Sequence, residues 1–263
     1  MTLLHGACED VLPTLDTGSV EAIAGDPPYA ITRAEWDTPI DWPVFWQHAA
    51  RLLARPSSAV VLTGVQPFVT DLINSNRPWF RDELIWEKNH ATGHLNARRR
   101  PMRAHESILV FSMAAHVYSP QMRPIGSDPW LRESSRSGVK RSGGGQLSEL
   151  HGYQPPSTWT ETGLRFPRTV LRFAKTGNAH RGRRERSTGK PLALMEYLVR
   201  QYSKPDDTIL DPFVGRGTTL IAAARAGRPA IGIERCEAEC ERAADRITRE
   251  LADADADVPA IAA

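Results

Sequence analysis

The segment 208–234 constrains the fold of this chain more than any other stretch. The apolar run 208–210 ends at Asp211, a Gly-x-Gly turn and a helical pattern follow, and a second apolar run, 229–233, ends at Glu234. A strand, a turn, a helix and a second strand in this order form a parallel βαβ unit. We therefore expect an α/β fold built on a mostly parallel sheet.

The residues of this unit suit a nucleoside-like ligand. Gly215 and Gly217 let the backbone approach a ligand without a Cβ in the way. The helix N-terminus that follows, near Thr218, favours a carboxylate or a phosphate. Glu234 can accept hydrogen bonds from both ribose hydroxyls. The turn lacks the lysine of a phosphate-binding loop and the third glycine of the dinucleotide fingerprint. A dinucleotide oxidoreductase is therefore disfavoured, and a nucleoside with a charged amino-acid tail fits better.

The motif Asp26-Pro27-Pro28-Tyr29 marks a second candidate site. It follows the strand candidate 20–24, and neither proline can donate a hydrogen bond to continue a strand ladder. The chain therefore turns here, with a carboxylate on one side of the corner and an aromatic ring on the other. Such a pair suits a planar ligand that carries an amine, as nucleobases do. On its own, the same pattern is more often a turn with a half-exposed tyrosine.

Apolar periodicity predicts the remaining elements. Further strands are expected at 3–4, 59–63, 83–86, 107–111 and 169–173, and helices at 7–15, 41–53, 66–74, 192–202, 218–225 and 238–251. Between 112 and about 165, Gly, Ser, Pro and Arg dominate, and the pattern predicts no regular structure. We interpret this stretch as a mobile insertion that orders on its partner.

The net charge of +2 hides an uneven distribution. The segment 98–190 has 18 Lys and Arg against 6 Asp and Glu, whereas the rest of the chain has 15 against 25. An acidic body with one strongly basic segment indicates a polyanionic partner. Basic segments are often merely solvated, but an excess of this size favours nucleic acid.

Length and cysteine usage exclude several classes of protein. The 263 residues and a hydrophobic content of 41% fit one large domain, or one domain with an insertion. Cys8, Cys236 and Cys240 form neither a disulfide framework nor a zinc pattern, so we expect reduced thiols in a cytoplasmic protein. The sequence shows no secretory signal and no apolar run of membrane-spanning length, so no membrane partner is expected. His105 and Glu106 lack metal-ligand spacing, and we interpret them as structural.

The two motifs together resemble those of a known enzyme family. Asp211-Pro-Phe-Val-Gly-Arg-Gly-Thr-Thr219 and Asp26-Pro-Pro-Tyr29 are similar to the motifs of the S-adenosylmethionine-dependent DNA amino-methyltransferases, which modify adenine N6 or cytosine N4. The target motif precedes the cofactor motif, an order that resembles the circularly permuted β group. Shorter words resemble those of phage and bacterial adenine methylases: Trp36-Asp37, Gln66-Pro67-Phe68, Ile85-Trp86-Glu87-Lys88, His105-Glu106, Tyr118-Ser-Pro-Gln121 and Lys190-Pro191.

The resemblance implies a fold and a division of the chain. The fold is a doubly wound, mostly parallel, Rossmann-like methyltransferase sheet, circularly permuted, with an inserted basic target-recognition region. Residues 1–111 would form the catalytic half and 181–252 the cofactor-binding half. Residues 112–180 would be the partly mobile target-recognition insertion, and 253–263 a disordered tail.

The resemblance also implies residue roles, with S-adenosylmethionine as the cofactor. The cofactor-binding residues would be Asp211, Phe213, Gly215, Gly217, Thr218, Glu234, Thr188, Lys190 and Pro191, of which Glu234 holds the ribose and the last three close over the tail. The DNA-binding residues would be Arg98, Arg99, Arg100, Arg103, Lys140 and Arg141. The chain departs from the family pattern at Arg216, at Arg186-Ser187, and at Ala7, where many relatives carry an Asp that contacts the cofactor adenine. Glu9 or Asp10 is a candidate substitute for that Asp.

The catalytic hypothesis assigns the chemistry to Asp26, Pro27, Pro28 and Tyr29. The lone pair of an exocyclic base amine is conjugated into the ring, so the amine is a poor nucleophile. The Asp26 carboxylate and the Pro27 carbonyl can accept its two N–H bonds and free the lone pair, and positioning then supplies most of the catalysis. The base must first be flipped out of the duplex, and Tyr29 would stack on it.

Several alternatives stay open. Methylation of cytosine N4 uses nearly the same chemistry, although Asp at position 26 leans toward adenine. An RNA or a protein-amide substrate is disfavoured, and a catalytically dead DNA-binding relative would not be expected to retain Asp26, Tyr29, Asp211 and Glu234. Double-stranded DNA is the expected partner. A homodimer and a cognate restriction enzyme are further partners that the sequence leaves open.

Overall fold

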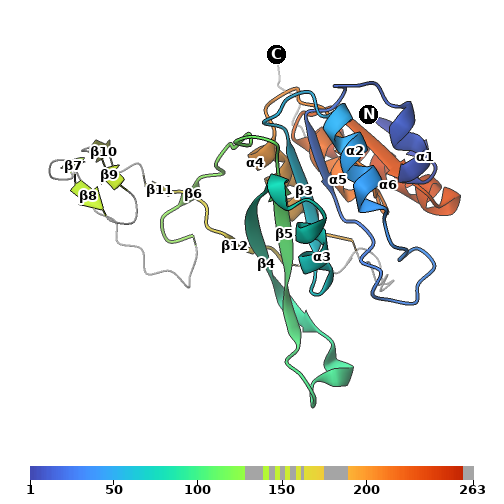
Figure 1. Ribbon diagram of the computed structural model, residues 1–263, viewed down its shortest axis with the longest axis horizontal. Coiled ribbons are helices and arrows are strands. Elements are labelled where there is room, and N and C mark those ends of the chain that lie inside the picture. The colour runs from blue at the N-terminus through green and yellow to red at the C-terminus, as the bar shows by residue number, and fades with distance from the viewer. Residues whose placement is uncertain are drawn as a thin grey trace. The chain divides into compact units, whose positions relative to one another are not determined.

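Figure 1 shows the computed structural model of the chain, which describes residues 1–127, 139–141, 146–148, 152–154, 158–160, 163–174 and 189–256. The chain divides into two compact units. Unit 1 comprises Met1–Ser119 and Thr169–Ala263, and unit 2 is Pro120–Arg168. Unit 2 falls inside the expected insertion 112–180. The segment before it belongs to unit 1, because the amides of Ala114 and Val117 donate to the carbonyls of Pro56 and Ser57.

Unit 1 is organised around an eight-stranded sheet with the order β1-β14-β13-β2-β3-β5-β4-β12. Its strands are β1 (Thr2–His5), β2 (Ala22–Gly25), β3 (Ala59–Gly64), β4 (Phe80–Thr92), β5 (Arg103–Phe111), β12 (Val170–Arg172), β13 (Ile209–Asp211) and β14 (Ala230–Glu234). Within this sheet only β5 runs antiparallel to its neighbours. The sheet is therefore mostly parallel, as the pattern of strands and helices predicts.

Helices cover both faces of this sheet (Figure 1). They are α1 (Cys8–Val11), α2 (Trp42–Leu52), α3 (Phe68–Ser75), α4 (Leu192–Tyr202), α5 (Thr218–Arg225) and α6 (Glu237–Ala256), with 3₁₀ turns η1 (Leu12–Thr14), η2 (Arg77–Trp79) and η3 (His94–Asn96). Side chains alternate along each strand, so β3 sends Val60 toward α2 and α3, and Val61 toward α4 and α5. Two apolar cores result, and both faces of the sheet are buried.

Local chemistry explains where these helices begin and end. Asp41 caps α2 by accepting a hydrogen bond from the Val44 amide at 3.1 Å. The expected helix 7–15 is shorter, because Pro13 lacks an amide proton and the chain continues as the 3₁₀ turn η1. Pro191 precedes α4, and its carbonyl accepts from the amides of Leu194 and Met195.

Strands β4 and β5 form a longer hairpin than the sequence predicts (Figure 1). The expected strands 83–86 and 107–111 are only the buried middle of this ladder, which continues outward to the pair Thr92–Arg103. Both faces of the outer part are largely exposed, so apolar and polar side chains do not alternate along it. Apolar periodicity in the sequence therefore cannot predict this part of the hairpin. The tip contains Gly93, with φ of 91°, and η3.

Unit 2 contains short antiparallel ladders where the sequence pattern predicts no regular structure. Among its described residues, β6 (Arg123–Pro124) pairs with β11 (Leu164–Arg165), β7 (Val139–Arg141) with β10 (Thr158–Thr160), and β8 (Gln146–Ser148) with β9 (Gly152–Gln154). Strands of two or three residues are too short to show an alternating pattern, so the Gly-, Ser-, Pro- and Arg-rich sequence gives no sign of them.

Candidate active site

The two sequence motifs meet at neighbouring strand ends. Strands β2 and β13 are parallel partners, with Ile23 opposite Leu210, so Asp26 and Asp211 lie at the same edge of the sheet. Gly25 separates them: a Cβ at this position would lie 2.7 Å from Oδ1 of Asp211. A side chain at position 25 would therefore displace the Asp211 carboxylate, and glycine allows the motifs to approach.

Aromatic rings also connect the two motifs on one face of the sheet. The ring of Tyr29 lies 4.9 Å from that of Phe68, and Trp42 packs on Phe68 at 5.9 Å. Trp42 contacts Phe45, which stacks on Phe213 at 6.0 Å. Tyr29 and Phe213 thus belong to a single apolar cluster. This arrangement is required if one pocket is to hold both a target base and a cofactor.

Backbone amides organise the glycine turn around Glu234. Its two carboxylate oxygens accept from the amides of Gly215 at 2.8 Å and Cys236 at 2.9 Å. Gly217 has φ of 78° at the N-terminus of α5, a conformation that disfavours residues with a side chain. Gly215, with φ of 50°, has open space where a Cβ would lie. The turn therefore offers backbone and an acidic side chain to a ligand with little steric hindrance.

Asp211 is a buried carboxylate with few compensating partners. Burial raises its pKa to about 7, against hydrogen bonds from Thr219 and the Phe213 amide that lower it, and the nearby charges of Asp26 and Glu234 raise it further. A cationic ligand would offset both the cost of burying the ionised Asp211 carboxylate and its repulsion by Asp26 and Glu234. Asp211 is therefore suited to pair with an ammonium group.

The segment at positions 7–10 lies beside Glu234. His5 pairs with Glu234 in the sheet, and the Gly6 amide donates to the Glu234 carbonyl at 2.9 Å. Ala7 and α1 follow directly, with Glu9 and Asp10 exposed. Glu9 and Asp10, the expected substitutes at the cofactor adenine, therefore follow the strand that pairs with the one ending at Glu234.

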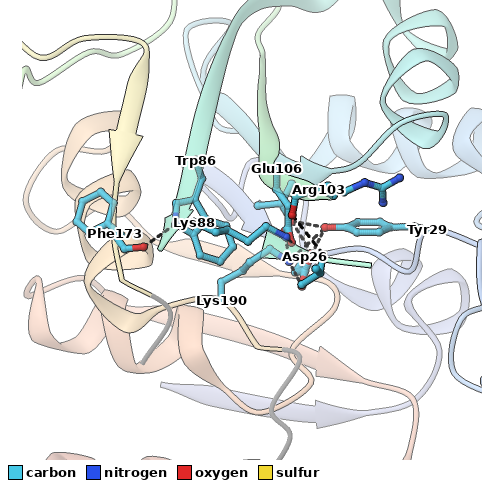
Figure 2. Close-up of polar contacts among 10 residues, drawn as sticks. Asp26, Tyr29, Trp86, Lys88, Arg103, Glu106, Phe173 and Lys190 are labelled. Atoms are coloured by element: carbon cyan, nitrogen blue, oxygen red, sulfur yellow. Dashed lines mark hydrogen bonds and ion pairs between the residues drawn. The ribbon is translucent and has the colours of Figure 1, made fainter. Parts of the chain in front are cut away.

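Asp26 is surrounded by hydrogen-bond donors (Figure 2). Its Oδ1 accepts from the hydroxyls of Tyr29 at 2.7 Å and Thr63 at 2.5 Å. Its Oδ2 accepts from the ammonium of Lys190 at 2.5 Å. Burial raises the pKa of the Tyr29 hydroxyl, and the Asp26 charge raises it further, so this hydroxyl stays protonated as a donor.

Lys190 lies with the target motif, although the family resemblance assigns it to the cofactor tail. Besides Asp26, its ammonium contacts the Tyr29 hydroxyl at 3.2 Å and Glu106 at 3.2 Å. Burial acts to lower the pKa of Lys190, but the negative charges of Asp26 and Glu106 and the hydrogen bond to Asp26 outweigh it and hold the pKa well above its ordinary value. Lys190 is therefore a fixed positive charge beside Asp26. Its neighbour Pro191 is buried at the start of α4.

Glu106 and Lys88 are site residues that the sequence interpretation missed. The Lys88 ammonium donates to Glu106 at 2.7 Å, and both side chains are largely buried. The sequence predicts only a structural role for His105 and Glu106, because they lack metal-ligand spacing. The available signal was that Lys88 and Glu106 both lie in short motifs that resemble those of adenine methylases. Thr63 carried no such signal, and only the fold brings it to Asp26.

Asp37 shapes the loop after the Pro-Pro corner. Its carboxylate accepts from the backbone amides of Tyr29, Ala30, Ile31 and Thr32 at 2.7 to 3.0 Å. Burial acts to raise the pKa of Asp37, but hydrogen bonds from the Thr32 side chain and from the amides of Thr32, Ala30 and Ile31 outweigh it and lower the pKa. The carboxylate stays ionised and fixes the backbone that carries Tyr29. This gives a structural reason for the Trp36-Asp37 word.

The remaining predicted residues lie in several places. Arg98, Arg99 and Arg100 are exposed at the tip of the β4–β5 hairpin, and Arg103 is half-buried where its guanidinium donates to the Gln66 carbonyl at 3.2 Å. Lys140 and Arg141 lie in β7, opposite Trp159 and Thr158. Pro27 is buried and Pro28 half-buried at the corner, and Thr218 is the first residue of α5. Thr188 lies outside the described residues, as do Arg186 and Ser187.

Comparison with known proteins identifies the family. The model of the N6/N4 methyltransferase family, described as DNA methylase, matches residues 20–245. The chain belongs to the DNA methylase family. This DNA methylase is 26% identical over 239 residues to the type II methyltransferase M1.MboII of Moraxella bovis, covering 86% of this chain and 88% of the relative.

Solved structures show the same fold. The M1.HpyAVI–SAM complex matches with a TM-score of 0.58 at 20% identity, covering 93% of this chain and 98% of the other. TTHA0409 of Thermus thermophilus, complexed with S-adenosyl-L-methionine, matches with a TM-score of 0.57 at 22% identity, covering 95% of this chain and 96% of the other. The PvuII DNA methyltransferase, which is cytosine-N4-specific, matches with a TM-score of 0.59 at 15% identity, covering 95% of this chain and 92% of the other. These likenesses confirm the expected Rossmann-like methyltransferase fold.

Neither a metal centre nor a membrane span is found in the described residues. Across those parts of the chain, no three His, Cys, Asp or Glu side chains group as metal ligands. None of the helices among them combines the length and apolarity that crossing a membrane requires.

Proposed function

We propose that this DNA methylase transfers a methyl group from S-adenosylmethionine to the N6 amine of an adenine that is flipped out of duplex DNA. The observation that carries the proposal is the junction at Gly25. There β2 leads into Asp26, and a Cβ at position 25 would lie 2.7 Å from Oδ1 of Asp211 on the neighbouring strand. A target amine and a methyl donor held at these two sites would share one pocket.

The residues of the glycine turn fit the cofactor. Asp211 offers a buried carboxylate to the ammonium of the methionine part, and Gly215, which has open space where a Cβ would lie, leaves room for its carboxylate near the start of α5. Glu234 offers an acidic side chain to the ribose, beside the segment 7–10 that would meet the adenine. Phe213 offers the apolar surface between them. When bound, S-adenosylmethionine supplies an electrophilic sulfonium methyl group.

The protein's own residues prepare the target amine. Asp26 would accept one N–H of the amine and the Pro27 carbonyl the other, which frees the nitrogen lone pair from conjugation with the ring. Asp37 fixes the loop that carries Tyr29, so that its ring can stack on the flipped base, a contact worth about 1–3 kcal/mol. Neither motif contains a cysteine, so no covalent enzyme intermediate is required.

The basic residues would hold the duplex. Arg98, Arg99 and Arg100 are exposed on the hairpin tip, and most contacts of such side chains go to phosphates. Lys140 and Arg141 extend this proposal to unit 2. A base that is paired in a duplex hides its amine, so binding must include flipping, as for other enzymes that modify bases.

The test is methyl transfer from tritiated cofactor to duplex DNA, followed by mass spectrometry of the digested nucleosides. N6-methyladenine is the expected product. If the product is N4-methylcytosine, the target base is cytosine and not adenine, because Asp26 and the Pro27 carbonyl can equally accept from a cytosine amine. Absence of both would contradict the function.

The variant Asp26→Ala checks the assigned site. We expect turnover to fall by at least about a hundredfold, because a misplaced amine alone costs that much. Cofactor affinity, measured by calorimetry, should stay within about threefold, since Asp211 and Glu234 are unchanged. Equal losses of turnover and affinity would show that Asp26 maintains the pocket and does not act on the amine.

A further inference from the structure

Four charged side chains of alternating sign form a chain through the site (Figure 2). They run from Lys88 to Glu106, from Glu106 to Lys190, and from Lys190 to Asp26, at N···O distances of 2.7, 3.2 and 2.5 Å. The side chains of Lys88, Glu106 and Lys190 are 3, 15 and 6% exposed. The four come from β4, β5, the segment before α4 and the end of β2, so only the fold assembles them.

The contacts fix the Lys190 ammonium. The ammonium donates hydrogen bonds to Asp26 Oδ2 and the Tyr29 hydroxyl, and it forms an ion pair with Glu106 Oε2 at 3.2 Å. Glu106 is itself held from the other side by Lys88, which also lies 5.8 Å from the Trp86 ring. Trp86 is anchored by its indole N–H, which donates to the Phe173 carbonyl at 2.8 Å.

The same contacts leave Asp26 with one free acceptor position. An ionised carboxylate has about four lone-pair sites. In this structure Tyr29, Thr63 and Lys190 use three of them. One site is left to accept a single N–H of an incoming amine, and the direction of that site depends on where Lys190 holds Oδ2.

We propose that Glu106 is a positioning residue for methyl transfer: with Lys88 behind it, Glu106 holds the Lys190 ammonium on one oxygen of Asp26, so that the carboxylate presents a single oriented acceptor to the target amine. This inference rests on the proposed function of Asp26. Glu106 touches neither base nor cofactor in this scheme. It acts on the reaction through Lys190.

The test compares variants that remove or keep the charges of Lys88 and Glu106. Glu106→Gln removes the negative charge but leaves Lys88 buried and unpaired, which can unfold a protein for unrelated reasons. The double variant Lys88→Met with Glu106→Gln removes both charges together and leaves the Lys190–Asp26 pair. Glu106→Asp keeps the charge. The matched control is Glu87→Gln, which removes an exposed carboxylate whose partner is Arg172 at 2.8 Å.

We expect the double variant to lower kcat by at least about tenfold, because a small misplacement of a reacting group has effects of that order. Cofactor affinity and the KM for DNA should stay within about threefold, Glu106→Asp should recover most of the rate, and Glu87→Gln should match wild type. In a Lys190→Met background, Glu106→Gln should have no further effect on kcat, as expected for residues that act in series.

Other results would overturn the inference. A double variant with wild-type kcat would mean that Glu106 serves only to balance charge. Parallel losses of kcat, cofactor affinity and thermal stability would mean a structural role. If instead Asp26→Ala keeps wild-type turnover, the assigned role of Asp26 fails, whereas the absence of methyl transfer by the wild-type protein would contradict the proposed function itself. Both outcomes are independent of any Glu106 variant.

Discussion

Two carboxylates at adjacent strand ends, Asp26 and Asp211, have different surroundings and therefore different properties. Asp26 has an ammonium and two hydroxyls as donors, whereas Asp211 is buried with fewer donors and feels the charges of Asp26 and Glu234. The sequence contains both residues in an Asp-Pro pair, and their flanking residues place Asp26 in the target motif and Asp211 in the cofactor motif. The different surroundings support the proposed roles of Asp26 as amine acceptor and Asp211 as ammonium partner.

The raised pKa of Asp211 predicts how stability depends on pH. The pKa is about 7 in the folded protein against an ordinary value of 3.8, so the folded state holds this proton more tightly. The resulting contribution to the free energy of unfolding is fully present below about pH 4 and is lost as the pH rises through about 7. The variant Asp211→Asn has no ionisable group at this position, so its free energy of unfolding does not show this loss.

Chemical unfolding at pH 4 and pH 8 measures this effect. Relative to wild type, Asp211→Asn should gain up to about 4 kcal/mol between the two pH values, since one pKa unit corresponds to about 1.4 kcal/mol. Asp71→Asn, an exposed site on α3, is the control and should show no such gain. A pH-independent difference for Asp211→Asn would show that this carboxyl titrates at an ordinary pH.

At the scale of elements, the β4–β5 hairpin separates two tasks along one ladder. Its inner part is buried and carries Lys88 and Glu106 into the site, while its tip is exposed and carries Arg98, Arg99 and Arg100. A basic tip on a two-stranded arm suits contact with DNA phosphates. The tip is therefore expected to contribute affinity without contributing to chemistry.

Replacing Arg99 and Arg100 by Ala should weaken DNA binding and reduce its salt dependence. The slope of log affinity against log salt should fall by about one for each phosphate that is no longer neutralised, while kcat at saturating DNA stays near wild type. Fluorescence anisotropy across a salt series measures the slope. The same change at Arg242 and Arg249, on the exposed side of α6, should leave the slope unaltered. An unchanged slope in the hairpin variant would remove the tip from the DNA interface.

At the scale of the whole molecule, the site exists because segments near the two ends of the chain become neighbouring strands. Gly25 is the point of contact, where a Cβ would lie 2.7 Å from Asp211 and 3.4 Å from the Phe213 ring. The loop after Tyr29 is also joined to the far end of the chain, because Arg235 donates to the Thr38 hydroxyl at 2.5 Å. These contacts couple the target motif to the cofactor motif.

Gly25→Ala should therefore damage both sites at once. We expect a loss of stability of about 1–3 kcal/mol from overpacking, together with weaker cofactor binding because the Asp211 carboxylate must move. Thermal unfolding and calorimetry with the cofactor measure the two effects. Full cofactor affinity in a destabilised variant would show that Asp211 tolerates the displacement and that the junction is only a packing contact.

Much of the fold could be predicted from sequence because its signals are local. Apolar runs predicted the buried strands, and helical periodicity predicted the helices at 41–53, 192–202 and 218–225. The outer hairpin could not be predicted, because a ladder exposed on both faces has no apolar alternation. The short strands of unit 2 could not be predicted either, because two or three residues are too few to show an alternating apolar pattern.

The sequence by itself determined the family, the order of the two motifs and the residues most directly assigned to them, because each motif is a continuous stretch whose backbone chemistry is local. Only the tertiary structure decided that Lys190 pairs with Asp26, that Thr63, Glu106 and Lys88 join the site, and that Asp211 has a raised pKa. These properties depend on burial and on distances between side chains that come from different strands. A linear pattern does not contain those distances.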